Sequence, residues 1–376
     1  MAMTSRAIFS LILVLSTSFF LLPHPCDGHS LKICSFDQIY QFGDSISDAG
    51  NLIREPVGAT TSACRRLPYG QTFFHRATGR CSDGQLMIDF IAKAAGLPFL
   101  DAYKDNGGDF THGVNFAVAG STALSVEYLA KRNISIPITN SSLGVQLDWM
   151  SKHFDSICNT SRDCVEKFKD SLFMVGTIGG NDINGALLQG KSIKETKSLV
   201  PSMVQAKKNA VRTVVRYGAV RVVVPGNFPI GCFPIYLTRF KTNNSTAYDE
   251  HKCLKDLNEL TKFQNEQLRR GIRELKKEFP NVVITYGDYY KAFEWLYNNA
   301  DYLGFDTSTK QKACCGSGGD YNFNLTRQCG ADPDVPVCQN PNQLISWDGI
   351  HLTQEAYKHM AAWLVDDLLP KLHCSS

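Results

Sequence analysis

The feature that most constrains the fold of this chain is a repeated alternation of strand-like and helix-like segments. Short apolar runs rich in Val and Ile suit strands that helices bury on both faces. Such strands in alternation with helices favour one α/β domain with a mainly parallel sheet. The strands are expected at Gln38–Phe42, Gly113–Ala117, Leu172–Ile178, Val220–Val224 and Val282–Tyr286.

The helix-like segments between these runs have start and stop signals. Ser82 and Asp83 precede an apolar pattern that stops at Gly96, as expected for a capped helix. The other expected boundaries are a stop at Gly218, a stop before Pro280 and a start near Thr353 and Glu355. Because 376 residues are many for one such sheet, we expect sizeable disulfide-pinned loops as well.

The N-terminus has the pattern of a secretory signal peptide. Arg6 is followed by an apolar run over residues 7–22 and by the small residue Gly28, which is the order of a positive, an apolar and a cleavage region. We therefore divide the chain into a signal peptide, residues 1–28, and a single domain, residues 29–376. A membrane anchor is the alternative, but the run is short for a span and lacks a strongly charged flank. No stable membrane anchor is expected.

The cysteine content agrees with secretion. The chain has 13 cysteines, and removal of Cys26 with the signal peptide leaves 12, an even set that in a secreted chain indicates disulfides. Two close pairs stand out, Cys158 with Cys164 and Cys232 with Cys253, and a cluster is expected to pair within itself: Cys314, Cys315, Cys329 and Cys338. A zinc site is the alternative for this cluster, although adjacent cysteines lack the usual zinc-knuckle spacing.

Charge and glycosylation signals describe the surface. A net charge of +3 without a long basic run gives no reason to expect a nucleic-acid partner. The N-x-S/T pattern marks candidate glycosylation sites in surface loops when it follows a signal peptide. The acceptor residues are Asn133, Asn140, Asn159, the overlapping Asn243 and Asn244, and Asn324.

The turns after the expected strands carry candidate chemistry, because ligands of open α/β sheets bind beyond the carboxyl ends of the strands. Ser45 follows the first strand in the sequence Gly43-Asp44-Ser45. This serine is either a nucleophile presented at the edge of the sheet or an ordinary turn or helix-cap residue. Asp44 is expected to hold the loop through hydrogen bonds and not to act in catalysis.

A candidate base lies near the C-terminus. Asp348 and His351 are three residues apart, which on a helical turn places them on one face. A carboxylate in this position can accept a hydrogen bond from one imidazole nitrogen and leave the other nitrogen as a base. The alternative is a surface Asp-x-x-His pair at the start of a helix.

Two other turn residues are candidate hydrogen-bond donors to a reacting oxygen. Gly120 has no side chain, so its backbone N–H can approach such an oxygen closely. Asn181 follows two glycines and can offer its side-chain amide. Taken singly, each is explained as a tight-turn residue. Together with the serine and the Asp-His pair, they make up the groups that acyl transfer requires.

Four blocks of this sequence resemble the GDSL, or SGNH, family of serine hydrolases. They occur in the family order as FGDSISDAGN, GVNFAVAGST, GGNDIN and WDGIH, and the stretches between them also resemble the secreted plant members. Ile46 stands where the family name has Leu, and Ala119 precedes Gly120 where many plant members have two glycines. The chain has no G-x-S-x-G pentapeptide, which argues against the α/β-hydrolase fold.

The resemblance implies a three-layer α/β/α SGNH-hydrolase fold of the flavodoxin-like kind, and it implies a role for each block residue. Ser45 would be the nucleophile, His351 the base and Asp348 its orienting partner. The oxyanion hole would consist of the backbone N–H groups of Ser45 and Gly120 and the amide of Asn181. The implied protein is a monomeric carboxylic-ester hydrolase that needs neither metal nor organic cofactor. Its expected location is the secretory pathway, with the apoplast or the vacuole as destination.

The same resemblance suggests the substrate. Several stretches, among them HGVNFAVAGSTAL and NPNQLISWDGIHLTQEAY, look closest to the branch that includes acetylajmalan esterase and sinapine esterase. This branch implies a small-molecule ester of a specialised metabolite, such as an acetylated indole alkaloid. Phe228 and Phe233 lie in PGNFPIGCFP after an expected strand, where they either form a wall of the substrate pocket or belong to the core.

Three other functions remain open on the sequence alone. One is a generic short-chain esterase or lipase, and another is an acyltransferase that uses the same triad on an alcohol acceptor. A non-catalytic binding protein on the same fold is the third. The presence of all five block residues disfavours the binding protein, because such a protein would commonly have lost one of them.

Overall fold

Five parallel strands form one sheet at the centre of the computed structural model, which describes residues 30–374. The strands are β1 (Gln38–Phe42), β2 (Gly113–Asn115), β3 (Ser171–Val175), β4 (Arg221–Pro225) and β5 (Val283–Gly287). They are arranged in the order β2-β1-β3-β4-β5. This is the flavodoxin-like order, in which the ligand site lies beyond the carboxyl ends of β1 and β3.

The expected strands are confirmed, but two of them end earlier than expected. β2 stops at Asn115 because the Asn115 side chain accepts a hydrogen bond from the N–H of Ala117 at 3.0 Å and closes a turn. β3 stops at Val175 because Gly176, with a φ of 131°, leads the chain out of the sheet. Both early ends place residues in loops that surround the end of β1.

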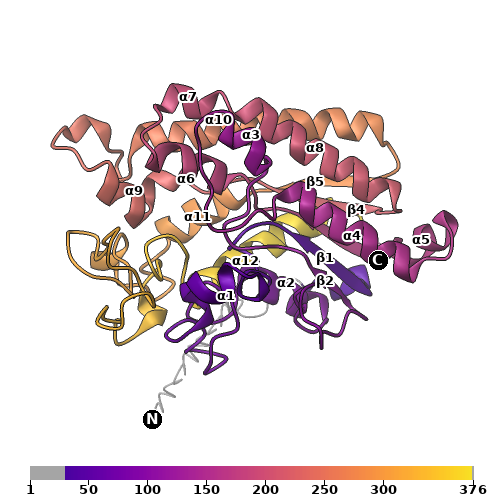
Figure 1. Cartoon of the computed structure of the whole chain (residues 1–376), viewed down its shortest axis with the longest axis horizontal. Coiled ribbons are helices and arrows are strands. Elements are labelled where there is room, and N and C mark those ends of the chain that lie inside the picture. Colours follow the sequence, from indigo (N-terminus) through magenta and orange to yellow (C-terminus); the bar gives the residue numbers. More distant parts are fainter. Residues whose placement is uncertain (1–29, 375–376) are drawn as a thin grey trace, which may run out of the picture.

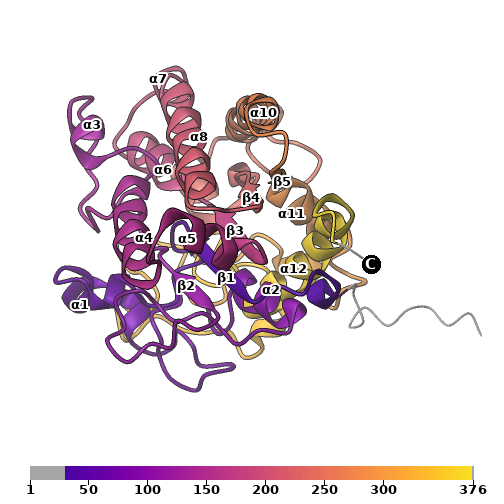
Figure 2. The same cartoon turned by 90° about the vertical axis from the view of Figure 1, so that its right-hand side faces the viewer.

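Helices cover both faces of the sheet (Figure 2). In one layer α8 (Val200–Arg216) packs against α4 (Leu143–Ile157) and α10 (Lys255–Glu278). In the other layer α12 (Gln354–Leu368) packs against α2 (Met87–Ala95) and α11 (Tyr289–Asn298). The expected three-layer α/β/α architecture is therefore confirmed.

The other helical segments are short. The remaining α-helices are α1 (Gly58–Thr61), α3 (Val126–Ala130), α5 (Ser161–Phe168), α6 (Gly180–Leu188), α7 (Ile193–Lys197) and α9 (Pro234–Arg239). Single 3₁₀ turns occur at Leu31–Cys34, Leu52–Arg54, Ala63–Arg65, Ile230–Cys232, Ser245–Ala247, Thr307–Thr309, Pro341–Gln343 and Leu369–Lys371.

The expected start of the second helix was wrong. α2 begins at Met87, after Leu86, whose N–H donates to the Asp89 carboxylate at 2.8 Å. Ser82 and Asp83 do not cap it. Instead they bind the segment after His351, because Ser82 Oγ donates to the carbonyl of Leu352 and Asp83 accepts from the N–H of Gln354. The two polar residues thus join distant parts of the chain.

The other helix ends agree with their sequence signals. The helix that stops at Gly96 ends there in the left-handed conformation, with a φ of 78°, which glycine adopts without steric cost. α10 ends at Glu278, before Pro280. α12 starts after Thr353, whose hydroxyl accepts from the N–H of Ala356.

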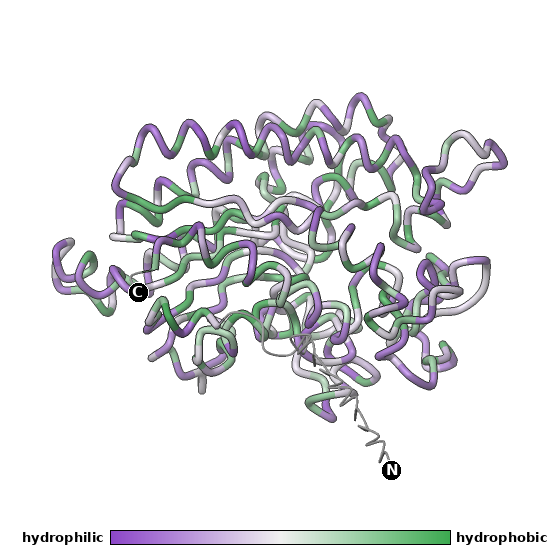
Figure 3. Tube along the Cα trace, turned by 180° about the vertical axis from the view of Figure 1, so that it is seen from behind, coloured by the Kyte–Doolittle hydropathy of each residue, from purple (hydrophilic) through white to green (hydrophobic). Residues whose placement is uncertain are grey.

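The core follows the sheet, as Figure 3 shows by the hydrophobic residues along the strands and the hydrophilic outer helices. Tyr40 on β1 stacks on Phe173 of β3 with ring centroids 5.0 Å apart. The same ring meets Phe154 of α4 and Phe168 of α5 edge-on at 4.8 and 5.4 Å. These buried rings fix the helix layer over the two strands whose ends carry the site.

Six disulfides lie within the described residues. They join Cys34 to Cys374, Cys64 to Cys81, Cys158 to Cys164, Cys232 to Cys253, Cys314 to Cys338 and Cys315 to Cys329. The last four agree with the expected pairs and the expected cluster, while the first two were not anticipated.

The proposed signal peptide and Cys26 lie outside the described residues. Between residues 30 and 374, no helix has both the length and the hydrophobicity that a membrane span requires.

The carboxyl ends of the strands point to one side of the molecule, at the left of Figure 1. Helices α6 and α9, which follow β3 and β4, lie on this side, and so does the long loop between α11 and α12. The C-terminal end of the described chain lies at the opposite side. All the candidate residues of the four blocks come from the segments that gather on the left.

Candidate active site

The turn after β1 presents Ser45. Gly43 adopts a φ of 147°, and a Cβ at this position would lie 2.8 Å from the carbonyl oxygen of Thr177, so only glycine fits here. The Asp44 N–H then donates to this carbonyl at 3.0 Å. The Asp44 carboxylate accepts from the N–H of Ile46 at 3.1 Å, so Asp44 holds the loop as expected.

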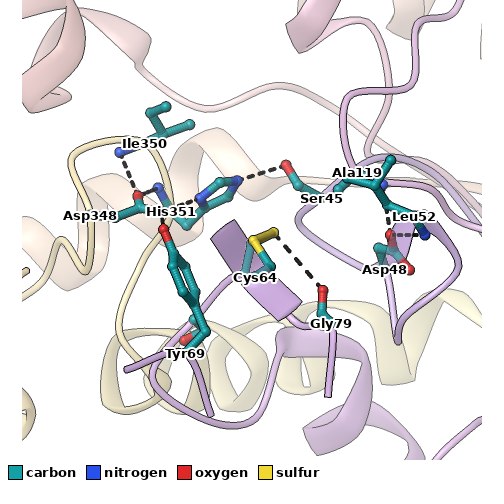
Figure 4. Close-up of a disulfide and its surroundings, with 12 residues drawn as sticks. Ser45, Asp48, Leu52, Cys64, Tyr69, Gly79, Ala119, Asp348, Ile350 and His351 are labelled. Carbon is teal, nitrogen blue, oxygen red and sulfur yellow. Dashed lines mark hydrogen bonds and ion pairs between the residues drawn. A yellow bond between two sulfur atoms is a disulfide. The ribbon is translucent and has the colours of Figure 1, made fainter. Parts of the chain in front are cut away.

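The structure brings Ser45, His351 and Asp348 into one line of contacts (Figure 4). The Nε2 atom of His351 lies 2.8 Å from Ser45 Oγ, and its Nδ1 atom lies 2.7 Å from Asp348 Oδ2. All three side chains are largely buried. Because a carboxylate only accepts hydrogen bonds, Nδ1 carries the proton and Nε2 is free to accept one from the serine.

Asp348 and His351 lie on a turn before α12, not on a helical turn. The Asp348 Oδ1 atom accepts hydrogen bonds from the N–H groups of Ile350 and His351 at 2.9 and 2.8 Å. Burial alone raises the pKa of Asp348, but the attraction of His351 and these hydrogen bonds outweigh it, so the pKa lies below its ordinary value. The three-residue spacing thus correctly indicated a contact between Asp348 and His351. The local structure that makes the contact is a turn held by the Asp348 carboxylate and not a helical turn.

The candidate oxyanion donors lie on the turn after β1 and on the segments that follow β2 and β3. Within residues 30–374, the backbone N–H groups of Ser45 and Gly120 have no hydrogen-bond acceptor. Gly120 has a φ of 84°, and a Cβ there would lie 2.7 Å from a methyl carbon of Ile138. The Asn181 amide donates one N–H to the carbonyl of Ser121 at 2.9 Å, which orients the amide and leaves its second N–H available.

The sequence reasoning missed the role of Asp48. This fully buried carboxylate accepts four backbone hydrogen bonds, from Gly50, Asn51, Leu52 and Ala119, at 2.6 to 3.1 Å. The bond from Ala119 ties the turn after β1 to the residue that precedes Gly120. Asp48 therefore sets the distance between two candidate oxyanion donors, and only its place in the first block marked it.

Tyr69 is a second residue that the sequence reasoning missed. Its hydroxyl donates to Asp348 Oδ2 at 2.8 Å. The tyrosine lies in the stretch LPYGQTFFHRATGRCSDGQLMIDFIA, which resembles the plant family members. Nothing in that stretch indicates a carboxylate 279 residues away.

A buried cation lies behind the nucleophile turn. Lys207 of α8 is 2% exposed and is attracted to Asp44 and Asp182. Burial lowers the pKa of Lys207 and raises the pKa of both carboxyl groups, while the attraction between the charges opposes each shift. Asp182 also accepts from the N–H groups of Ala123 and Leu124 at 2.8 and 3.0 Å, which fixes the loop that follows Gly120.

A cavity of about 50 Å³ opens beside Ser45. Phe228 and Phe233 both line it, although both are also core residues, 2% and 7% exposed, that pack on Phe293. The other lining residues are Asp44, Ile46, Thr177, Gly180, Asn181, Asn184, Asn227, Ile230, Tyr236 and Ile350. A larger hollow of about 330 Å³, lined by residues of 250–252 and 307–321 and by Tyr297, contains none of the block residues.

The glycosylation candidates lie at the surface. Asn133, Asn140, Asn159, Asn243 and Asn244 are exposed, and Asn324 is partly exposed. Asn324 Oδ1 accepts from the N–H and the hydroxyl of Thr326 at 2.9 Å. These positions are accessible, and their modification stays a prediction.

Comparison with known proteins shows that the chain is similar to esterases over most of its length. The profile of the family described as GDSL-like Lipase/Acylhydrolase matches residues 39–364. Acetylajmalan esterase 2 from Rauvolfia serpentina is 46% identical over 347 residues, which cover 92% of this chain and 94% of that protein. Acetylajmalan esterase 1 from the same plant is 45% identical over 343 residues, 91% of this chain and 89% of that protein. A GDSL esterase/lipase from Arabidopsis thaliana is 42% identical over 374 residues, 99% of both chains.

Proposed function

The chain belongs to the family of GDSL-like lipases and acylhydrolases and is a carboxylic-ester hydrolase, and we propose that Ser45, His351 and Asp348 are its catalytic triad. The observation that carries this proposal is the line of contacts from Ser45 Oγ through both imidazole nitrogens to Asp348, at 2.8 and 2.7 Å. A nucleophile, a base and an orienting carboxylate within hydrogen-bond reach are the arrangement that covalent acyl transfer uses.

In the proposed reaction, His351 Nε2 takes the proton of Ser45 as Oγ attacks the ester carbonyl carbon. Asp348 holds the Nδ1–H and stabilises the imidazolium that forms. The imidazolium then gives its proton to the departing alcohol, and an acyl-enzyme remains. Water, activated by the same imidazole, hydrolyses this ester and releases the acid and the free serine. The scheme requires no cofactor.

The negative charge of the tetrahedral intermediates would be held by three donors. Two are the backbone N–H groups of Ser45 and Gly120, which have no other acceptor within the described chain. The third is the amide N–H of Asn181 that Ser121 does not use. Donors fixed before the reaction stabilise the transition state without reorganisation, which is the largest single contribution in such sites.

The triad is tested by Ser45→Ala. We expect turnover of p-nitrophenyl acetate to fall on the order of 10⁴- to 10⁶-fold, with an unchanged melting temperature. A fluorophosphonate probe should label wild type at Ser45 and should not label the variant. If the purified variant retains more than a few per cent of wild-type turnover, Ser45 is not the nucleophile and the proposed triad is wrong.

For the substrate, we propose a small acyl group on a bulky alcohol, such as an acetylated indole alkaloid. Two relatives that are 45% and 46% identical are named for such an ester. The cavity beside Ser45 is small, about 50 Å³, against the several hundred Å³ of a typical site for a drug-sized ligand. Its size favours a small acyl group over a long acyl chain. Phe228 and Phe233 would then line the acyl side of the site.

A panel of esters tests this assignment. We expect kcat/KM to be higher for an acetylated indole alkaloid and for p-nitrophenyl acetate than for p-nitrophenyl octanoate and trioctanoin. Sinapoylcholine tests a larger acyl group on a small alcohol. If trioctanoin is turned over best, a lipase replaces the metabolite esterase. Product analysis with a competing alcohol detects any acyl transfer.

We further propose that the protein is secreted to the apoplast or the vacuole as a glycosylated monomer. Six disulfides among the described residues support passage through an oxidising compartment. The protein would be purified from a secreting plant host. Sequencing of its mature N-terminus tests secretion, and glycan mapping at the six sequon asparagines tests glycosylation. Its mass in solution tests the monomer.

A further inference from the structure

We propose that Tyr69 is a positioning residue for the acid–base pair, which holds Asp348 in place and extends activity to lower pH. The proposal rests on the triad proposed above. It concerns a residue outside all four sequence blocks, and it follows from the contacts that surround the Asp348 carboxylate.

Among residues 30–374, four hydrogen bonds reach the carboxylate of Asp348, and Tyr69 donates the only one that comes from outside the turn of Asp348 (Figure 4). Oδ1 accepts from the N–H groups of Ile350 and His351. Oδ2 accepts from His351 Nδ1 at 2.7 Å and from the Tyr69 hydroxyl at 2.8 Å. The phenol therefore shares an oxygen with the imidazole and ties the turn to the rest of the protein.

Covalently linked segments hold both sides of this contact. Tyr69 is 3% exposed and lies within the loop that the Cys64–Cys81 disulfide closes. Its ring packs edge-on against Trp347, the residue before Asp348, with centroids 6.0 Å apart. The Trp347 carbonyl in turn accepts a hydrogen bond from the N–H of Cys315 at 2.7 Å, and Cys315 forms a disulfide with Cys329.

The next residue after Cys329 closes the packing around the phenol. A Cβ at Gly330 would lie 2.9 Å from an edge carbon of the Tyr69 ring, so the glycine leaves just enough space for the tyrosine. A buried tyrosine needs an acceptor somewhere, which is the purely structural explanation of the contact. That explanation requires no particular acceptor, whereas the observed one is the oxygen that orients the base.

The chemical consequence follows from the direction of the hydrogen bond. Burial, reinforced by the negative charge of Asp348, raises the pKa of Tyr69 well above its ordinary value, so the phenol remains a donor at working pH. The partial positive charge on the phenol proton offsets part of the negative charge of the carboxylate, and this negative charge would otherwise stabilise an imidazolium. The contact therefore favours the neutral imidazole, which is the active base. Within the described part of the chain, Asp44 from the turn after β1 and Tyr357 from α12 also face the pair.

Tyr69→Phe removes the hydroxyl and keeps the ring. For p-nitrophenyl acetate we expect kcat to fall about tenfold, the loss expected for one hydrogen bond to a charged group, with KM within about threefold of wild type. The acidic midpoint of the kcat/KM profile should move to higher pH by about half a unit. Replacing Tyr69 with 3-fluorotyrosine, a stronger donor of similar size, should move this midpoint in the opposite direction.

The matched control is Tyr217→Phe. Tyr217 donates to the carboxylate of Asp155 at 3.2 Å on the exposed surface, so its loss should leave both kcat and the midpoint unchanged. A Tyr69→Phe enzyme with a lower melting temperature but a wild-type kcat and midpoint overturns the proposal and leaves a structural role. Should Tyr69→Phe not fold, an unshifted midpoint in the fluorotyrosine protein overturns it. Activity in Ser45→Ala would instead refute the triad itself.

Discussion

Asn181 has one amide N–H bound to Ser121 and one left for a reacting oxygen. We expect Asn181→Ala to lower kcat by about 100- to 1,000-fold with little change in KM, since an oxyanion donor acts mainly on the transition state. Steady-state kinetics on p-nitrophenyl acetate measures both constants.

Asn299→Ala is the matched control for this substitution. Asn299 is also partly exposed and donates its amide to a backbone carbonyl, that of Trp295 at 2.8 Å, at the end of α11. Its kinetic constants should equal those of wild type. If Asn181→Ala instead raises KM and leaves kcat unchanged, the amide binds the ground state and is not an oxyanion donor.

At the scale of the element, the start of α12 depends on pH through Glu355. His359, whose Nε2 lies 3.2 Å from Glu355 Oε1, and then Lys358, at 2.9 Å, lower the pKa of Glu355 to about 2. Because this folded-state pKa lies below the ordinary value, the stabilisation is complete above about pH 4.5 and is lost as pH falls toward 2.

We therefore expect Glu355→Gln to lower the free energy of unfolding by about 1–3 kcal/mol at pH 6, and by less at pH 3. Denaturant titrations at the two pH values measure the difference. Glu166→Gln is the control, because Glu166 pairs with Lys169 while 67% of its side chain is exposed, and such surface pairs contribute little. A Glu355 effect that is equal at both pH values contradicts the linkage argument.

At the scale of the whole molecule, the Cys34–Cys374 disulfide joins the two ends of the described chain across 340 residues. Cys34 precedes β1, so the bond lies at the amino ends of the strands, away from Ser45. In the chain-entropy description, a loop of this length stabilises the folded state by up to about 6 kcal/mol. Cys34→Ser with Cys374→Ser should lower the melting temperature and leave kcat/KM at 25 °C unchanged.

The Cys158–Cys164 disulfide closes a loop of only 6 residues and is the comparison for this prediction. Its removal by two serines should cost about 2 kcal/mol on the same description. Thermal unfolding of both variants, with activity assayed below the transition, gives the ranking. Equal losses of stability would show that loop length does not determine the contribution of these bonds.

Much of the architecture was predictable from the amino-acid sequence alone. The Val- and Ile-rich runs located all five strands, and Gly96, Pro280 and Thr353 marked helix ends. These signals are local, because the side-chain period and the backbone preferences of a few residues specify them. The four blocks identified the family, and the structure brings Ser45 and His351 to 2.8 Å. The local prediction failed at Ser82, which was expected to cap a helix but donates instead to the distant carbonyl of Leu352.

Folding in three dimensions determined the rest. The position of β1 between β2 and β3 sets the turns of Ser45, Gly120 and Asn181 side by side, and no periodicity in the chain specifies strand order. Tyr69 meets Asp348 across 279 residues, and Asp48 meets Ala119 across 71. Such contacts depend on how whole loops pack and on which cysteines come within bonding distance. A residue that acts through them has the same local sequence signal as one that merely fills the core.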